Sequence, residues 1–141
     1  MTSTLTPLGW VSLTEAGGVI TGLEWHRAAG ETSPLLTEAA AQIAAYFDGR
    51  LTQFDLPLYF GTGFQARVRR AMADIPYGET KTYGDLARDL SAPAQAIGQA
   101  CGANPIPILI PCHRVLGATS LGGFSAPGGV ESKVALLRLE K

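Results

Sequence analysis

The sequence predicts two small lobes: an N-terminal α/β lobe over residues 1–60, with a small sheet and one helix, and a C-terminal lobe over residues 61–141 built mainly of helices. Three observations lead to this fold class. The first lobe shows strand-like alternation followed by one helical pattern, a glycine-rich break lies at residues 60–63, and several short helical segments follow. A chain of 141 residues has room for two such lobes.

The N-terminal lobe is expected to begin with a hairpin over residues 10–25, because two alternating segments flank a turn with two glycines. A helix is predicted over residues 34–47, where Pro occupies the first position and apolar residues recur at helical spacing. Gly49 ends that helix. Residues 53–58 are expected to form a short strand that closes the lobe.

The C-terminal lobe is expected to contain helices over residues 64–73, 83–90, 93–101 and 131–139. Thr82 and the acid three residues later match a capping signature, which indicates the start of the second of these helices. The last helix is expected to bury three apolar residues: Val134, Leu136 and Leu137.

The two helices at 83–90 and 93–101 are joined by a tight break and therefore resemble a helix-turn-helix. Such a pair is either a packing unit or a DNA-binding motif. Gly98 lies in the middle of the second helix, where glycine costs about 1 kcal/mol relative to alanine. Either it allows close packing on another helix, or it lets this helix lie flat against a bulky partner such as a nucleic-acid groove.

The composition, with 46% hydrophobic and 16% charged residues, is typical of a globular protein. The sequence has no apolar run of membrane-spanning length and no basic segment followed by an apolar one at its start. We therefore expect no membrane association, no signal peptide and a cytoplasmic location. Residues 1–60 carry six acidic and two basic side chains, and residues 61–141 carry six and nine. This asymmetry weakly indicates an anionic partner for the second half.

The strongest chemical signal is the segment 104–115, NPIPILIPCHRV, which places Cys112 next to His113 after an apolar run. A thiol beside an imidazole is a common source of a nucleophilic thiolate. A disulfide to Cys101 is not expected in a cytoplasmic chain, and two histidines without a Cys-x-x-Cys spacing do not support a metal site. We expect Cys112 to be the reactive thiol and Cys101 to be a small buried hydrophobic residue.

Adjacent side chains diverge, so His113 need not touch Cys112 directly, and a water would bridge the two. A carboxylate on the other ring nitrogen would set the tautomer of the imidazole. Glu131 and Glu140 are both candidates for that carboxylate.

Four segments, in order, resemble the O6-alkylguanine-DNA alkyltransferases, also called methylated-DNA–protein-cysteine methyltransferases: residues 61–65, 75–80, 82–87 and 104–115. The likeness covers about residues 61–140 and is most specific in the last segment. The first lobe matches in layout only, which implies an RNase H-like arrangement, and the second lobe would carry a winged-helix-like helix-turn-helix. The resemblance implies an enzyme that acts once, as a monomer and without cofactor or metal, on duplex DNA containing O6-alkylguanine.

The resemblance also implies catalytic roles. Cys112 would accept the alkyl group, His113 would deprotonate it through a water, and Glu140 would hold His113. Tyr83 would donate a proton toward the leaving guanine. Asn104 would brace the active-site turn and hydrogen-bond near the base.

Further residues are implied in substrate and DNA binding. Ser125 and the backbone near Val115 would contact the guanine edge, and Pro107 would form a wall of the pocket. Arg114 would tie the motif to neighbouring carbonyls. The damaged nucleotide would be flipped into the pocket while the helix from residue 93 enters the minor groove. The residues implied in that helix are Gln95, Ala96 and Gly98.

The chain departs from the family pattern on the DNA side. Gln95 stands where the family has arginine, the turn before it is two residues short, and Arg69 replaces a common tryptophan. These changes predict retained alkyl transfer with a weak grip on duplex DNA. Two rival functions are a non-catalytic lesion-binding protein, which the presence of Cys112 disfavours, and a thiol hydrolase, which needs an oxyanion hole that the sequence does not identify.

Overall fold

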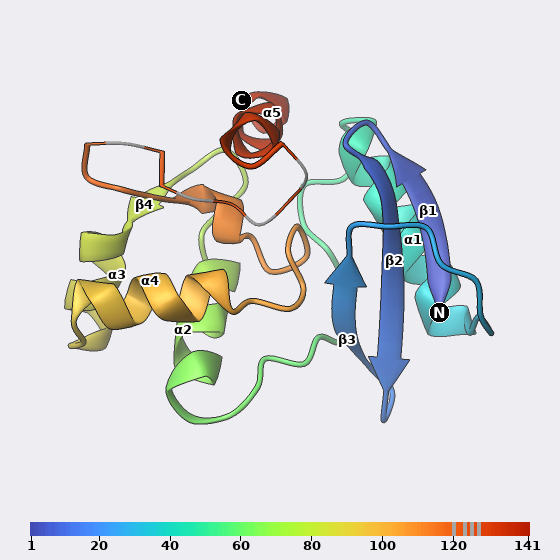
Figure 1. Cartoon of the computed structure of the whole chain (residues 1–141), viewed down its shortest axis with the longest axis horizontal. Helices are drawn as coiled ribbons and strands as arrows, with labels where there is room; N and C mark the ends of the chain where they lie inside the picture. Colours follow the sequence, from blue (N-terminus) through green and yellow to red (C-terminus); the bar gives the residue numbers. More distant parts are fainter. Residues whose placement is uncertain (120, 123, 125, 127) are drawn as a thin grey trace. The chain divides into compact units, whose positions relative to one another are not determined.

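The computed structural model describes residues 1–119, 121–122, 124, 126 and 128–141. The chain divides into two compact units, Met1–Tyr59 and Phe60–Lys141 (Figure 1). Within the described ranges, no helix has the length and apolar character needed to cross a bilayer.

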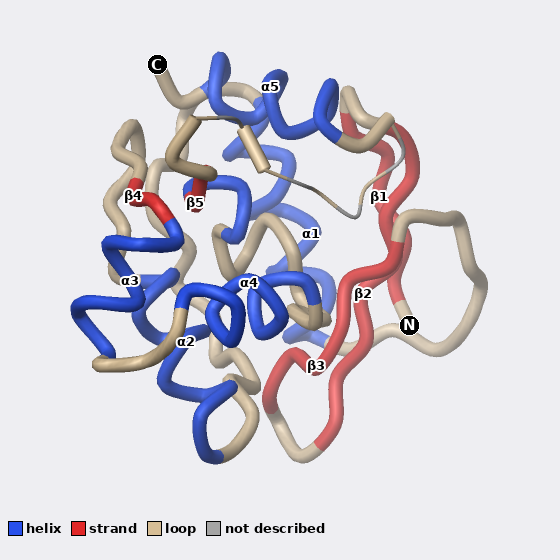
Figure 2. Tube along the Cα trace, turned by 60° about the vertical axis from the view of Figure 1, so that its left-hand side comes forward, coloured by secondary structure: helices blue, strands red, loops and turns tan. Residues whose placement is uncertain are grey.

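The first unit contains a three-stranded antiparallel sheet in the order β1-β2-β3 and one helix (Figures 1 and 2). The predicted hairpin is confirmed as β2 and β3, and the predicted helix is confirmed as α1. The sequence analysis missed β1, which pairs along its whole length with β2. The bounds are β1 Thr2–Thr6, β2 Gly9–Ala16, β3 Val19–Glu24 and α1 Pro34–Phe47.

Helix α1 contacts all three strands, and its buried residues join those of the sheet in one core. The Ser33 hydroxyl caps the helix by accepting a hydrogen bond from the Leu36 amide at 3.1 Å. The core residues of this unit include Val11, Leu13, Ile20, Leu23, Leu36, Ala39, Ile43 and Tyr46.

The predicted strand over residues 53–58 is wrong, because this segment forms only an isolated bridge between Ile20 and Leu58. The Ile20 amide donates to the Pro57 carbonyl at 2.8 Å, and the Tyr59 amide donates to the Ile20 carbonyl at 2.9 Å. Proline has no N–H group, so Pro57 cannot donate to a ladder.

The second unit consists mainly of helices, with β4 and β5 forming a two-stranded parallel pair (Figures 1 and 2). The four predicted helices are confirmed within one residue at either end, and the β4–β5 pair was not predicted. The bounds are α2 Gly63–Ala73, β4 Lys81–Thr82, α3 Tyr83–Leu90, α4 Ala94–Gly102, the 3-10 helix η1 Cys112–Arg114, β5 Val115–Leu116 and α5 Val130–Leu139.

The helix pair α3–α4 follows from local signals. Thr82 and Asp85 form the predicted capping box, in which each side chain accepts from the other residue's amide, at 3.0 and 2.8 Å. Ser91 ends α3 in the left-handed conformation, with φ of 53°. Helices α3 and α4 contact each other, and α2 contacts both.

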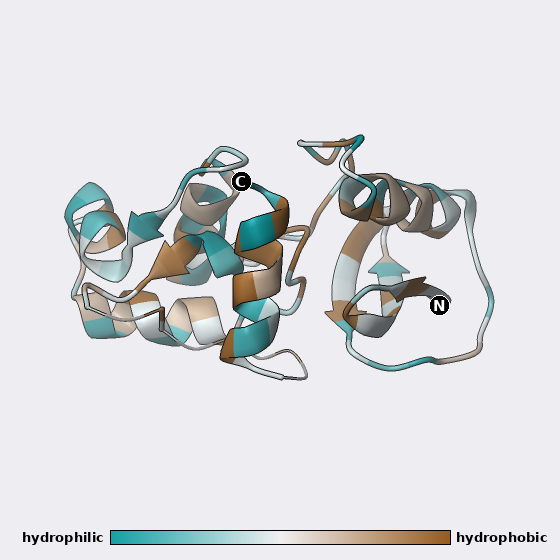
Figure 3. Cartoon of the chain, turned by 90° about the horizontal axis from the view of Figure 1, so that it is seen from above, coloured by the Kyte–Doolittle hydropathy of each residue, from teal (hydrophilic) through white to brown (hydrophobic). Residues whose placement is uncertain are grey.

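Helix α5 buries a different face from the one predicted. Leu136 is fully buried as expected, but Val134 and Leu137 remain partly exposed, while Ser132 and Lys133 are buried. Hydrophobic and hydrophilic residues are mixed along this helix (Figure 3). Residues 132, 136 and 140 follow one another at four-residue intervals, so the inward stripe also includes Glu140 just after the helix.

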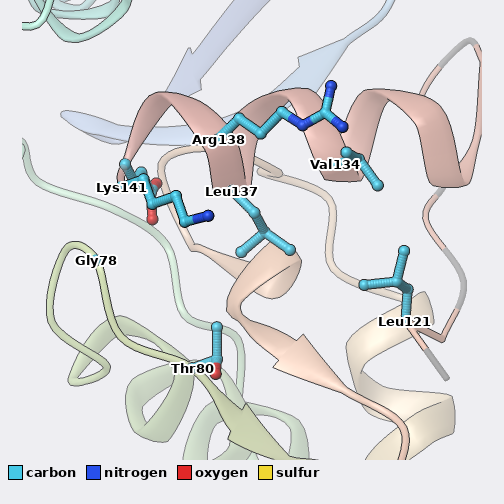
Figure 4. Close-up of a pocket in the computed structure, with 8 residues that line it drawn as sticks. Gly78, Thr80, Leu121, Val134, Leu137, Arg138 and Lys141 are labelled. Carbon is cyan, nitrogen blue, oxygen red and sulfur yellow. The ribbon is translucent and has the colours of Figure 1, made fainter. Parts of the chain in front are cut away.

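The partial exposure of Val134 and Leu137 has a structural cause, because both line a pocket of about 320 Å³ beside α5 (Figure 4). The other lining residues are Gly78, Thr80, Leu121, Arg138, Glu140 and Lys141.

Candidate active site

The segment before Cys112 is a buried loop that is closed by one asparagine. The side-chain nitrogen Nδ2 of Asn104 donates to the Ile110 carbonyl at 2.9 Å. The side-chain oxygen Oδ1 of Asn104 accepts from the Ile106 backbone amide at 3.1 Å. Both ends of the side chain are therefore used to brace the turn, as the sequence analysis expected. Buried isoleucine and leucine side chains fill the loop between them.

This loop contains a backbone outlier. Ile108 has φ of 72°, a conformation that β-branched residues rarely adopt and that costs about 1–3 kcal/mol. The hydrogen bonds of Asn104 and the bond from the Ile110 amide to the Ile106 carbonyl, at 2.9 Å, hold the strained residue in place. The strain lies four residues before Cys112, so the loop is built to present that residue in one conformation.

Cys112 begins η1 and is 9% exposed. Burial raises the pKa of its thiol, while a hydrogen bond with Asn104 and the positive charge of Lys133 act in the opposite direction. Little of Cys112 is therefore exposed, and the ionisation of its thiol depends on buried neighbours.

His113 is fully buried and is held by Glu140. Its Nε2 lies 2.6 Å from a Glu140 carboxylate oxygen, which decides between the two candidate acids, since Glu131 is exposed. Burial lowers the pKa of His113, and the bond to Glu140 opposes that shift. A neutral imidazole that donates from Nε2 to a carboxylate has an electron pair to accept a proton at Nδ1.

His113 Nδ1 is buried and has no hydrogen-bond partner among the described residues. A buried polar atom in that state marks a place for an ordered water or a reacting group. An unpartnered Nδ1 leaves this nitrogen available for the water that the sequence analysis predicts between the imidazole and the thiol of Cys112.

Arg114 fixes the position of Glu140. Its Nε and Nη2 donate to the two carboxylate oxygens at 2.8 and 3.0 Å, and its Nη1 donates to the Ile75 carbonyl at 2.7 Å. This is a buried bidentate pair, so the acid that orients His113 is itself held at two points.

Tyr83 lies at the start of α3, close to the loop that follows β5. A Cβ added to Gly122 would lie 2.9 Å from the Tyr83 hydroxyl and 3.4 Å from the Lys133 Nζ. Burial raises the pKa of Tyr83, and the charges of Cys101 and Cys112 raise it further. The hydroxyl therefore keeps its proton beside the two thiols.

Lys133 is the functional candidate that the sequence analysis missed. It is fully buried, and its Nζ donates to the Val115 carbonyl at 2.6 Å. A signal was present in the sequence: Lys133 precedes Glu140 by seven residues, so a helix that turns one of them inward also turns the other inward.

The remaining predicted residues fall into two groups. Val115 and Pro107 are buried, whereas Gln95 lies exposed on α4 and Ala96 is partly exposed. The structure therefore does not bring Gln95 and Ala96 into the buried network. Ser125 lies outside the described residues.

Gly98 is not explained by packing within this unit. No heavy atom of the described residues comes within 4 Å of a Cβ built on it, apart from its own helix and chain neighbours, and the same is true of Gly102. The interpretation of Gly98 as a close helix–helix contact is therefore wrong, and its small size faces open space.

Cys101 is 7% exposed, and burial raises its pKa to about 12. It is buried as expected. The charge of Cys112 raises its pKa further and the charge of Lys133 lowers it, so Cys101 belongs to the surroundings of the site.

Comparisons with known proteins agree on one family. The family model for the 6-O-methylguanine DNA methyltransferase, DNA binding domain, matches residues 63–141. A methylated-DNA–protein-cysteine methyltransferase of Mycobacterium tuberculosis strain H37Rv is 44% identical over 147 residues, which cover 96% of this chain and 88% of the relative. The inducible enzyme of that name from Bacillus subtilis is 46% identical over 79% of this chain and 63% of the relative.

A solved structure gives the same result for the fold. The crystal structure of Mycobacterium tuberculosis OGT in complex with DNA matches with a TM-score of 0.86 at 44% identity, over 99% of this chain and 91% of that one.

Proposed function

The chain belongs to the 6-O-methylguanine DNA methyltransferase family, and from that premise we propose that it repairs DNA by moving an alkyl group from O6 of guanine directly and irreversibly to Cys112. The observation that carries the proposal is the buried pair of His113 and Glu140, 2.6 Å apart, with His113 Nδ1 buried and without a hydrogen-bond partner among the described residues. The activity is that of a methylated-DNA–protein-cysteine S-methyltransferase.

The geometry supports a single displacement. His113 Nδ1 takes the thiol proton of Cys112 through a water, and the imidazolium that forms lies against the Glu140 carboxylate. The sulfur then attacks the alkyl carbon, an S–C bond forms, and the C–O bond to the guanine breaks. The electron pair of that bond stays on the base, where Tyr83 supplies a proton.

The product explains why each molecule acts once. Transfer leaves a thioether on Cys112, and neither water nor a thiol displaces the alkyl group of a neutral thioether, because a thiolate is a poor leaving group from carbon. An ether carbon is a poor electrophile, so the reaction needs both a thiolate and protonation of the leaving base. The buried relay and Tyr83 provide these two requirements.

We place the DNA on the exposed face of α4. Gln95, Gly98 and Gly102 lie on this helix, and the two glycines leave its surface open to close approach. The damaged nucleotide leaves the stack to reach the buried sulfur, because a base within a duplex does not expose O6 to a protein interior. Val115 and Pro107 line the pocket in this proposal, and Ser125 is proposed to contact the guanine edge.

Intact-protein mass spectrometry tests the function. Incubation with an oligonucleotide containing O6-methylguanine should add the mass of one CH₂ unit per protein, located on Cys112 and absent from Cys112→Ala. Unmodified protein after complete incubation would refute alkyl transfer. Release of many products per protein would instead indicate a hydrolase.

A second proposal concerns affinity. Gln95 carries no charge at the position where the family has arginine, so we propose that the protein binds duplex DNA with low affinity. A gel-shift titration with alkylated duplex at stated salt measures this directly, since phosphate contacts make affinity salt-dependent. Sub-micromolar binding near physiological salt would contradict weak binding without affecting the proposed chemistry.

A further inference from the structure

Lys133 is a charged side chain that is placed in the protein interior and fixed there. It lies on α5 with none of its surface exposed, and its Nζ donates to the Val115 carbonyl at 2.6 Å. Val115 begins β5, directly after the short helix that carries Cys112. The hydrogen bond therefore ties the ammonium to the backbone three residues after the sulfur.

The ammonium also lies near the proton donor of the proposed reaction. A Cβ on Gly122 would contact both the Tyr83 hydroxyl, at 2.9 Å, and Lys133 Nζ, at 3.4 Å, so the two groups lie close to the same point. Gly122 has φ of 72° and no side chain, which allows the loop to pass over both groups.

The charged and titratable groups around Lys133 come from several elements. Glu140 is the residue directly after helix α5, and it is paired with Arg114 and His113 of η1. Cys112 is in η1, Cys101 in α4 and Tyr83 in α3. The charges of the two thiols raise the pKa of Lys133, in opposition to burial, which lowers it.

A cation in this position acts on the sulfur. Electrostatic interactions are stronger in a buried site than in water, and an opposite charge nearby favours the ionised form of a group. Burial disfavours the thiolate of Cys112, so the site needs groups that compensate for that cost.

We propose that Lys133 is a positioning residue for alkyl transfer, whose buried ammonium, held by the Val115 carbonyl, stabilises the thiolate of Cys112. The proposal rests on the proposed function in one respect, that Cys112 is the alkyl acceptor. His113 removes the thiol proton, and Lys133 lowers the energy of the anion that remains.

The test measures thiolate formation without DNA. Wild type, Lys133→Met and Lys133→Arg are alkylated with iodoacetamide across a range of pH, and modification at Cys112 is quantified by peptide mass spectrometry. Arg138→Met is the matched control, since it removes an exposed cation from the same helix. The midpoint of the pH profile is compared, because a less acidic thiol gives a more nucleophilic thiolate and partly masks the effect on the rate at one pH.

We expect Lys133→Met to raise the midpoint by about one pH unit or more, with Lys133→Arg and Arg138→Met near wild type. A wild-type midpoint in Lys133→Met would overturn the proposal. Failure of the proposed function is a separate result: wild type would then take no methyl group from O6-methylguanine DNA, while its iodoacetamide profile would still respond to Lys133.

A reciprocal measurement needs no Lys133 variant and therefore decides the matter if Lys133→Met does not fold. The Lys133 ammonium is titrated by NMR in wild type before and after alkylation of Cys112. Linkage requires that a thiolate stabilised by the ammonium also stabilises the ammonium. Lys133 should therefore lose its proton at lower pH once the sulfur is a neutral thioether, and an unchanged midpoint would exclude the interaction.

Discussion

Replacing Glu140 with glutamine should test the buried network most directly. The carboxylate lies opposite three donors: His113 Nε2 at 2.6 Å, and Arg114 Nε and Nη2 at 2.8 and 3.0 Å. Glutamine keeps the shape but removes the negative charge and one acceptor oxygen. Arg114 then remains buried without its charge partner, and its bond to the Ile75 carbonyl alone does not neutralise it.

Breaking a buried ion pair from one side costs about 3–5 kcal/mol, because the remaining charge is uncompensated. A domain is stable by only about 5–15 kcal/mol, so Glu140→Gln should lose a large part of the free energy of unfolding. With a urea m-value of about 1–3 kcal/mol/M, the unfolding midpoint should fall by about 1 M or more. Glu131→Gln, an exposed acid on α5, should change the midpoint little.

The double variant Glu140→Gln with Arg114→Met separates charge from packing. Removing both charges leaves neither one unpaired, so the double variant should be at least about 2 kcal/mol more stable than the sum of the single effects predicts. Urea unfolding of the four proteins completes the cycle. Additive effects, or a loss below about 1 kcal/mol for Glu140→Gln, would refute the assignment of this pair as a buried ionic contact.

Three further outcomes follow from the same structure. Gln95→Arg should increase the affinity for duplex DNA and make the slope of log K against log salt steeper by about 0.9, because it adds one phosphate contact. Gel shifts measure both quantities, with Gln99→Arg as a charge-matched control. Equal gains in affinity for the two variants would show that position 95 has no special role. Gly98→Ala should raise the free energy of unfolding by about 1 kcal/mol, since its methyl meets open space, and should weaken DNA binding; unchanged affinity would remove this face of α4 from the interface. Burial raises the pKa of Cys101 from its ordinary value of 9.0 to about 12, so its stabilising contribution is fully present below pH 9.0 and is lost as pH rises toward 12. Cys101→Ala should flatten the alkaline decline in stability by about 1.4 kcal/mol per pH unit, and an unchanged decline would show that Cys101 is not its source.

Local patterns were sufficient for most of the helices. The capping box at Thr82 and the αL break at Ser91 involve contacts within a few residues, so the start and end of α3 could be predicted from the chain alone. The apolar spacing over residues 34–47 specified α1 in the same way. That Cys112 and His113 are neighbours in the chain also needed no structure.

The roles of the buried charges were decided by tertiary structure. Glu140 lies 27 positions from His113. The spacing of residues alone left Glu131 and Glu140 as candidates and the family resemblance implied Glu140, but only the inward face of α5 brings Glu140 into contact with the imidazole. Lys133 shares that face because it precedes Glu140 by seven residues, and the packing of α5 against η1 buries both side chains. Pro57 limited a predicted strand to one bridge, and the open space around Gly98 excluded a packing role.

By itself, the sequence determined which helices form, because capping and helical period act over a few residues, and it led to the prediction that Cys112 is the reactive cysteine. Only the tertiary structure showed that Glu140 contacts the histidine and that the Lys133 ammonium is buried against the Val115 carbonyl. Those outcomes depend on long-range packing, which sets the burial and hence the strength of each charge.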